Sequence, residues 1–285
     1  MSPIRAAITV VSTPAARPAR TRPAVERDGV RMVAVGECTA DQHELGSAAG
    51  AFAQGDVRAP TGLPGSMWVL ARRERETWVY EDLAGVRPVY VAHTPRGVVW
   101  ASRMTPPAAL TGAAVDWTAL VAEMSVGGVD SPDRPGFAGI RQVRSGRALV
   151  LDGDGAWMER DVRGPHEDVS LAEAAALLRP ALTDAVRRRV AAGRGPVWSA
   201  DVSGGLDSGT IGALAADEEH GGDVVGCVYH DTHTPAVDLA GARSIAARFP
   251  RLDLRVTFGG AGTVHYTGLD GTLPLPVTDR PAFSI

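Results

Sequence analysis

The chain has 285 residues and a formal net charge of −4, and a chain of this length suggests about two domains. Hydrophobic residues make up 45% and charged residues 22% of the sequence, values typical of a globular protein with a sizeable core. The charge balance gives no electrostatic case for nucleic acid or an anionic membrane as a partner.

The cysteine content and the hydropathy of the sequence indicate the cellular location that we expect for the protein. Cys38 and Cys227 lie far apart and form no CxxC pattern, which excludes a multi-disulfide scaffold and a cysteine-based zinc site and favours a reducing, cytoplasmic location. No apolar run approaches the roughly 18–20 residues that a membrane-spanning helix needs. Residues 6–11 are too short a run for a signal peptide, and we interpret them as a first strand.

Short apolar runs separated by turn residues predict a largely antiparallel β region in the first half of the chain. Before it, residues 13–27 are rich in Pro, Ala and Arg and are interpreted as a flexible surface loop. Strands are expected at 31–36, 67–71, 77–80, 86–92, 98–101 and 147–151. A turn at 152–155 then leads into 156–160, which predicts a hairpin.

Helical periodicity replaces this pattern after a polar, helix-breaking boundary at residues 162–169. Ser170 and Glu173 form a capping-box pair, and apolar residues recur at helical spacing to about Val190. Strands are then expected at 196–202, 224–229 and 255–258, with helices at 210–216 and 239–249. This β-α-β-α-β alternation predicts a parallel, doubly wound sheet. We therefore expect two domains, at residues 1–162 and 170–285.

The segment between the first of these strands and its helix predicts a phosphate site. It reads Ser203-Gly204-Gly205-Leu206-Asp207-Ser208. Paired glycines let the backbone approach a ligand closely and adopt a positive φ, and successive N–H groups at a helix N-terminus can bind an anion. The Ser203 and Ser208 hydroxyls can donate to phosphate oxygens. The Asp207 carboxylate would repel phosphate, so we expect an intervening Mg²⁺ ion.

This segment fits neither of the common nucleotide motifs. No lysine follows the glycines, as a Walker A loop requires, and the GxGxxG spacing of dinucleotide folds is missing. A strand–SGGxDS–helix arrangement instead resembles the loop of N-type ATP pyrophosphatases. The resemblance implies ATP and Mg²⁺ as cofactors, activation of a carboxylate as an acyl-adenylate, and displacement of AMP by a nitrogen nucleophile. A plain glycine turn between a strand and a helix is the alternative.

Three segments of the first half resemble class B asparagine synthetases. Residues 81–90 (EDLAGVRPVY) resemble their RDxxGxRPLYY segment, residues 99–102 (VWAS) their FASE strand, and residues 137–146 (FAGIRQVRSG) their FxGIxxLxPG segment. The resemblance covers residues 30–258. It implies an N-terminal-nucleophile (Ntn)-hydrolase-like α/β sandwich, followed by an adenine-nucleotide α-hydrolase-like domain with a Rossmann-like parallel sheet.

The resemblance also suggests where the adenine ring lies. In the family, backbone at the end of the strand after the loop helix holds the ring, which corresponds to Val228 and Tyr229. Asp238 resembles the acidic position of the family's DExxxA segment, although a helix-capping role explains it equally well. The segment 230–233 (HDTH) offers metal-binding side chains, but we interpret it as a loop that lines the nucleotide pocket.

Departures from the family pattern bear on the source of nitrogen. The glutaminase nucleophile of the family is a cysteine exposed at the N-terminus, whereas this chain has Ser2, a much weaker nucleophile. Cys38 is too internal to replace it, and segments of the RGPD and NGEIYN kind are missing. We infer a degenerate first domain without glutaminase activity. Among relatives that use an amine already present in the substrate, the lasso-peptide macrocyclases resemble this chain more than the β-lactam synthetases do.

The family's second acidic segment, of the GDGGDE type, does not occur before Ile285. We therefore expect a partial synthetase domain whose catalytic residues lie beyond Ile285. The leading hypothesis is an AMP-forming carbon–nitrogen ligase that acts on a small-molecule or peptide carboxylate, as a cyclase of a peptide precursor. The alternatives are asparagine biosynthesis from aspartate and ammonia, a non-catalytic nucleotide-binding remnant, and one half of a split enzyme. The sequence predicts no oligomeric state.

Overall fold

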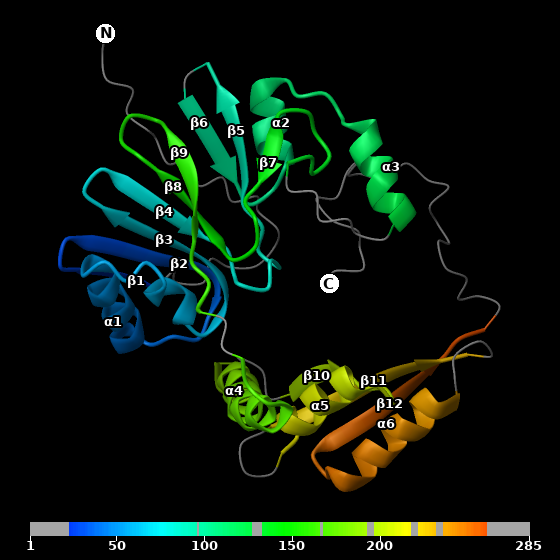
Figure 1. Cartoon of the computed structure of the whole chain (residues 1–285). Helices are drawn as coiled ribbons and strands as arrows, with labels where there is room; N and C mark the ends of the chain where they lie inside the picture. Colours follow the sequence, from blue (N-terminus) through cyan, green and yellow to red (C-terminus); the bar gives the residue numbers. More distant parts are fainter. Residues whose placement is uncertain are drawn as a thin grey trace. The chain divides into compact units, whose positions relative to one another are not determined.

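A computed structural model describes residues 23–95, 97–126, 133–165, 168–192, 197–217, 222–231 and 236–260. They form two compact units, which we call the first unit (residues 23–165) and the second unit (residues 168–260). Both contain helices and strands (Figure 1), which confirms the predicted α/β class. The strand expected at residues 6–11 lies outside the described residues. None of the described helices is both long and apolar enough to cross a membrane.

Two antiparallel sheets build the first unit, as the spacing of apolar runs predicts. Six strands pair in the order β1-β2-β3-β4-β8-β9, and three pair in the order β6-β5-β7. Their bounds are Ala24–Arg27 (β1), Val30–Cys38 (β2), Gly65–Arg73 (β3), Glu76–Tyr80 (β4), Tyr90–Thr94 (β5), Gly97–Ala101 (β6), Ile140–Gln142 (β7), Arg147–Leu151 (β8) and Trp157–Asp161 (β9).

Apolar side chains from both sheets fill the space between them. Val79 and Leu149 of the six-stranded sheet are fully buried in one cluster with Val91 of the three-stranded sheet. Successive side chains of a strand point to opposite faces, so each sheet also carries apolar residues on its outer face. There α1 (Gln42–Ala53) covers the larger sheet and α2 (Thr105–Thr111) the smaller one (Figure 1). The resulting order of helix, sheet, sheet and helix is an α/β sandwich.

The loop predicted for residues 13–27 is wrong at its C-terminal end. Residues 24–27 form β1, which pairs with β2 as the antiparallel arm of a hairpin. Asp28 and Gly29 make the turn with φ angles of 50° and 76°, and Val25 packs against the core. Pairing with β2 and the contact of one apolar side chain therefore outweigh the weak strand preference of these residues. The rest of the predicted loop, residues 13–22, lies outside the described residues.

Helix α1 lies in a region where the sequence patterns predict no helix. It begins with a capping box, in which Asp41 Oδ1 accepts the Glu44 N–H (2.7 Å) and Glu44 Oε2 accepts the Asp41 N–H (2.9 Å). Its inward face is fully buried, and the Phe52 ring meets the Trp78 ring edge-on at 5.5 Å. A short 3-10 helix, η1 (Ala59–Gly62), follows α1. A further α-helix, α3 (Trp117–Val126), follows α2.

We expect Asp41→Ala to lower the free energy of unfolding by about 1 kcal/mol, because an alanine N-cap leaves the first N–H groups of α1 without a side-chain acceptor. Urea denaturation of the chain measures the change. Gln42→Ala is the matched control, since this neighbouring residue is exposed and outside the capping box. Identical unfolding midpoints for wild type and Asp41→Ala would show that the cap does not stabilise the unit.

A turn precedes β5 and shortens the strand predicted at residues 86–92. The Asp82 carboxylate organises it by accepting the Val86 N–H at 2.9 Å. The Ser145 hydroxyl, far along the chain, donates to the Leu83 carbonyl at 3.1 Å. Two of the segments that resemble asparagine synthetases therefore meet here in a turn.

The second unit contains a parallel sheet, as the alternation of elements predicts. Its strands pair in the order β10-β11-β12. The bounds are Leu171–Ala192 (α4), Val197–Asp201 (β10), Leu206–Ala215 (α5), Asp223–His230 (β11), Ala236–Arg248 (α6) and Leu252–Phe258 (β12). The predicted capping box of α4 is confirmed, because Ser170 N–H donates to Glu173 Oε2 at 2.9 Å and Glu173 N–H donates to Ser170 Oγ at 3.3 Å.

The helices of the second unit cover one face of its sheet. Helices α4, α5 and α6 contribute to a single buried cluster with Val224 and Val228 of β11. Right-handed crossovers between strands that lie in sequential order put their helices on the same side. The second helical layer of a doubly wound sheet is therefore not seen within residues 168–260, and the alternate side chains of β11 and β12, such as Tyr229 and Arg255, are exposed.

Candidate nucleotide-binding loop

The six residues predicted to bind pyrophosphate span a loop and the first turn of a helix. Ser203, Gly204 and Gly205 form the loop after β10, and Leu206, Asp207 and Ser208 open α5. The helix predicted at 210–216 therefore begins within the motif. The Val202 N–H donates to the Cys227 carbonyl at 2.9 Å, so pairing with β11 continues to the last residue before the loop.

Two serine hydroxyls join the loop to the helix. Ser203 Oγ and Ser208 Oγ lie 2.9 Å apart, and Ser208 Oγ also accepts the Ser203 N–H at 3.3 Å. The Gly205 N–H donates to Ser203 Oγ at 3.1 Å. Both side chains are half-buried, and these bonds hold the loop in a closed turn beside the first residues of α5.

The N-terminus of α5 has the features of an anion site. Gly205 is its N-cap and supplies no side-chain acceptor, so the first N–H groups of the helix remain uncapped. These groups and the helix dipole favour a negative charge. Asp207 lies exposed in the same turn. The positive φ predicted for the glycines does not occur, since Gly205 has φ −74° and ψ 154°, and Gly204 is not among the glycines of positive φ.

Gly204 has a different role, which is close packing against the first turns of α6. A Cβ atom at Gly204 would lie 2.7 Å from the Val237 carbonyl oxygen and 3.2 Å from the Asp238 Cα atom. A Cβ atom at Gly241 would in turn lie 2.4 Å from the Gly204 Cα atom. The loop therefore lies in backbone contact with α6, and the N-terminal turns of α5 and α6 flank it.

Val237 and Gly241 also belong to this site, although no sequence motif includes them. The signal that could have found them is Gly241 itself, which falls inside the predicted helix at 239–249. A glycine in a helix interior costs about 1 kcal/mol relative to alanine, so its presence there points to a packing requirement. Asp238, noted for its resemblance to an acidic family position, is half-buried in this first turn.

The predicted adenine contacts lie at the same edge of the sheet as the loop. Parallel pairing of Asp201 with Cys227 brings the carboxyl ends of β10 and β11 together. The Val228 side chain is 6% exposed and belongs to the core, and its residue is paired with Val256 of β12. Tyr229 is 40% exposed on the opposite face, and its hydroxyl donates to Asp231 Oδ2 at 3.0 Å.

Metal-binding side chains do not gather in the parts of the chain that the structure describes. Those parts contain no group of three His, Cys, Asp or Glu residues able to hold an ion. His230 Nδ1 is buried without a hydrogen bond, and its ring meets Phe258 edge-on at 6.3 Å. His233, the other histidine of this segment, lies outside the described residues. The Mg²⁺ ion expected at Asp207 would therefore need phosphate oxygens as further ligands.

Cys38 has an environment unsuited to a nucleophile. It ends β2 and is half-buried as a free thiol. Burial raises the pKa of the Cys38 thiol and the charge of Glu44 raises it further, although a backbone hydrogen bond from Ala40 opposes the change. A raised pKa leaves less thiolate at neutral pH than an ordinary cysteine has. Ser2, at the position of the family's nucleophile, lies outside the described residues.

Comparisons with known proteins support the resemblance over part of the chain. Residues 177–257 match the family model described as asparagine synthase, a stretch that runs from α4 into β12 and contains the loop. The similarity to asparagine synthases is thus found in the second unit and covers less than a third of the chain. No curated protein matches the sequence.

One similar solved structure is the glutamine phosphoribosylpyrophosphate amidotransferase from B. subtilis, complexed with ADP and GMP. The alignment has 12% sequence identity and a TM-score of 0.31, and it covers 87% of this chain. The chain spans about half of that protein, 51% of its length. At this TM-score the similarity carries no argument about the site.

Proposed function

We propose that this chain belongs to an ATP- and Mg²⁺-dependent ligase that activates a carboxylate as an acyl-adenylate and forms an amide bond. The observation that carries the proposal is the loop at residues 203–205, pressed against α6 without room for a side chain at Gly204. It lies beside the uncapped N-terminus of α5. A loop that only reversed the chain would need neither feature. The match of residues 177–257 to the asparagine synthase family supports the same chemistry.

Each residue of the site has a distinct part in this proposal. The uncapped N–H groups of α5 would bind pyrophosphate oxygens, with the Ser203 and Ser208 hydroxyls as further donors. Asp207, exposed in the same turn, would hold Mg²⁺ together with those oxygens. Backbone at Val228 and Tyr229 would bind the adenine ring. Bound ATP supplies an electrophilic α-phosphorus, which the substrate carboxylate attacks with release of pyrophosphate.

We further propose that the attacking amine belongs to the substrate and does not come from glutamine. The half-buried Cys38 thiol, with its raised pKa, offers no glutaminase nucleophile in the described part of the first unit. An amine within the substrate, such as the N-terminus of a peptide, would make the product a ring. The substrate class that we propose is therefore a peptide that carries an Asp or Glu side chain and a free N-terminus.

Exchange of labelled pyrophosphate into ATP tests the proposal, because reversible adenylation requires the carboxylate substrate. We expect exchange with the ligase to which this chain belongs, Mg²⁺ and a linear peptide that has a free N-terminus and an internal Asp or Glu. Aspartate with ammonia should give neither exchange nor asparagine, and formation of asparagine would instead favour the asparagine synthetase alternative. ATP binding without exchange for any carboxylate would contradict the ligase function and indicate a nucleotide-binding protein.

A further inference from the structure

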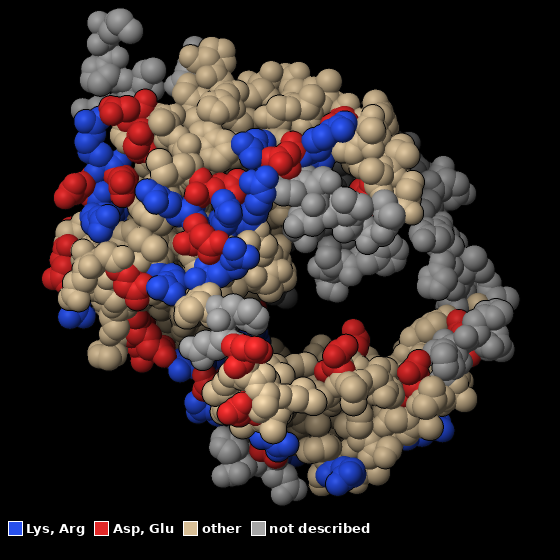
Figure 2. Space-filling view, viewed as in Figure 1, with Lys and Arg blue, Asp and Glu red and all other residues tan. Residues whose placement is uncertain are grey.

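An arginine-lined pocket lies in the first unit, in a region with no part in the proposed adenylation. It has a volume of about 490 Å³, within the usual range for small-molecule sites. Its lining includes His93, Arg141, Arg144, Arg147, Trp157 and Glu159. These residues come from β5, β7, the β7–β8 connection, β8 and β9, so both sheets of the sandwich contribute. Figure 2 shows basic side chains gathered, with acidic ones among them, over this part of the surface.

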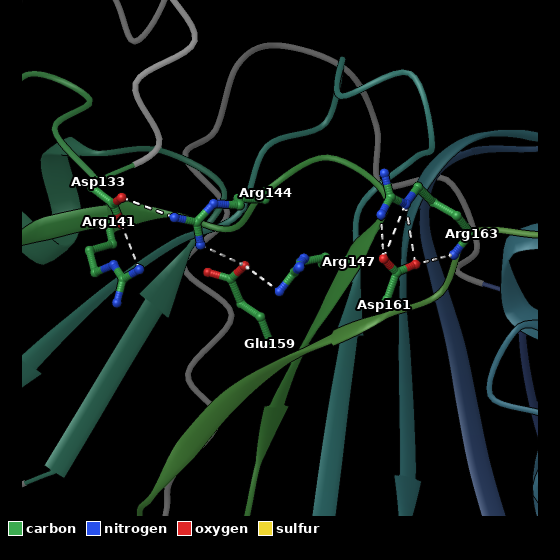
Figure 3. Close-up of polar contacts among 7 residues, drawn as sticks. All are labelled: Asp133, Arg141, Arg144, Arg147, Glu159, Asp161 and Arg163. Atoms are coloured by element: carbon green, nitrogen blue, oxygen red, sulfur yellow. Dashed lines mark hydrogen bonds and ion pairs between the residues drawn. The ribbon is translucent and has the colours of Figure 1, made fainter.

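The arginines of this pocket outnumber the carboxylates that hold them. Asp133 accepts hydrogen bonds from Arg141 Nη2 at 2.6 Å and from Arg144 Nη2 at 3.0 Å. Glu159 lies close to two guanidinium groups, with Oε2 at 3.6 Å from Arg144 Nη1 and 4.0 Å from Arg147 Nη1. Three positive charges therefore face two negative ones (Figure 3), which leaves a net charge of +1.

Several polar atoms of the pocket lack the hydrogen bonds that they could make. Glu159 has a side chain only 7% exposed, yet its Oε2 accepts no hydrogen bond. The Arg141 Nε atom is buried without an acceptor, and the Arg147 guanidinium donates to no described residue. Buried polar atoms are normally satisfied, and each exception calls for an explanation such as a bound group. The three arginine side chains remain 37–42% exposed, within reach of a ligand.

A neighbouring ion pair in the same unit contains an arginine whose hydrogen-bond donors have acceptors within the chain. Arg163 donates from both its backbone N–H and its guanidinium to Asp161 (Figure 3). These hydrogen bonds lower the pKa of the Asp161 carboxyl to about 2. The pair is electrically neutral and its contacts are complete within the chain. The arginine pocket, in contrast, has guanidinium donors without acceptors.

We propose that the arginine pocket binds a small molecule through an oxyanion group, either a carboxylate or a phosphate. Guanidinium groups bind carboxylates and phosphates by paired, charge-assisted hydrogen bonds. Arg144 and Arg147 both have guanidinium N–H groups that are available for such bonds. The Trp157 ring forms a fixed wall, because its Nε1 donates to His93 Nε2 at 2.9 Å and the Arg141 guanidinium lies 5.4 Å from the ring centroid. A cation would be repelled, and an uncharged apolar ligand would strip water from the guanidinium groups without replacing its hydrogen bonds.

Titration of the full chain with citrate and with inorganic phosphate tests this proposal and separates its two sources of oxyanion. Binding is followed by calorimetry and by the fluorescence of Trp157, isolated by comparison with Trp157→Phe. We expect saturable binding of one or both probes, weakened about 10-fold by Arg144→Ala or Arg147→Ala, since each removes charge-assisted hydrogen bonds. Arg163→Ala is the matched control and should leave the affinity unchanged.

The variants also separate binding from folding. Arg147 donates no hydrogen bond to a described residue, so Arg147→Ala should unfold at the wild-type temperature and still bind the probe more weakly. The proposal is overturned if wild type binds neither probe, or if both arginine variants bind as tightly as wild type. It is also overturned if Arg163→Ala weakens binding as much as they do, because a general loss of positive charge would then explain the effect.

Discussion

Gly204→Ala is expected to abolish measurable exchange of pyrophosphate into ATP. The added methyl group would lie 2.7 Å from the Val237 carbonyl oxygen, a backbone atom that cannot rotate away. Either the loop or the first turn of α6 must move, and a shift of about 1 Å in a reactive geometry can cost about 100-fold in rate. Overpacking of this kind also lowers the free energy of unfolding by about 1–3 kcal/mol. Exchange kinetics and urea denaturation measure the two effects.

The opposite side of the same contact provides an independent variant. Gly241→Ala places its methyl group 2.4 Å from the Gly204 Cα atom and should displace the loop without changing its sequence. Gly62→Ala is the control, because a Cβ atom there meets nothing within 4 Å and the residue has no positive φ. Normal exchange in both Gly204→Ala and Gly241→Ala would mean that contact between the loop and α6 is unimportant for nucleotide binding.

Asp207→Asn is expected to remove the dependence of ATP binding on Mg²⁺. The variant keeps the shape of the side chain and loses its charge, so an ion held between Asp207 and phosphate oxygens would lose its protein carboxylate. Metal ions supply several kcal/mol to such reactions, which corresponds to a fall in exchange rate on the order of 100-fold or more. Calorimetric titration with ATP, in the presence and absence of Mg²⁺, measures the binding effect.

The stability of Asp207→Asn distinguishes this role from a structural one. Asp207 is exposed in the first turn of α5, where loss of its charge should lower stability by about 0.3–1 kcal/mol. Asp223→Asn is the matched control, since this exposed aspartate lies at the opposite, amino end of β11. Equal Mg²⁺ dependence in wild type and Asp207→Asn would rule out Asp207 as the metal ligand.

Local signals predict much of this fold. The capping box at Ser170 marks the start of α4, and the alternation of apolar runs predicts the strands on either side of the loop. Helix α1 is missed because it contains Gly46 and Gly50, which favour other conformations in isolation. Both glycines pack close to the side chain of Arg27 in β1. Their requirement arises from a tertiary contact, which a local pattern does not reveal.

In the candidate site too, some features follow from local sequence and others depend on tertiary packing. The motif at residues 203–208 predicts a tight loop between a strand and a helix, although the helix begins at Leu206, four residues before its predicted start. The approach of α6 to Gly204 depends on how two elements pack, so it is visible only in three dimensions. The arginine pocket is likewise visible only in three dimensions, since residues from β5, β7, the β7–β8 connection, β8 and β9 meet there.

The turn built on Asp82 shows that a short sequence motif can be explained by folding as well as by chemistry. The Asp82 carboxylate accepts the Val86 N–H and the Ser145 hydroxyl donates to the Leu83 carbonyl, so these contacts hold the connection between β4 and β5. A folded sandwich needs such residues whatever reaction the protein carries out. Resemblance at this turn is therefore explained by architecture alone. A record of chemistry has to be sought in the loop at Gly204.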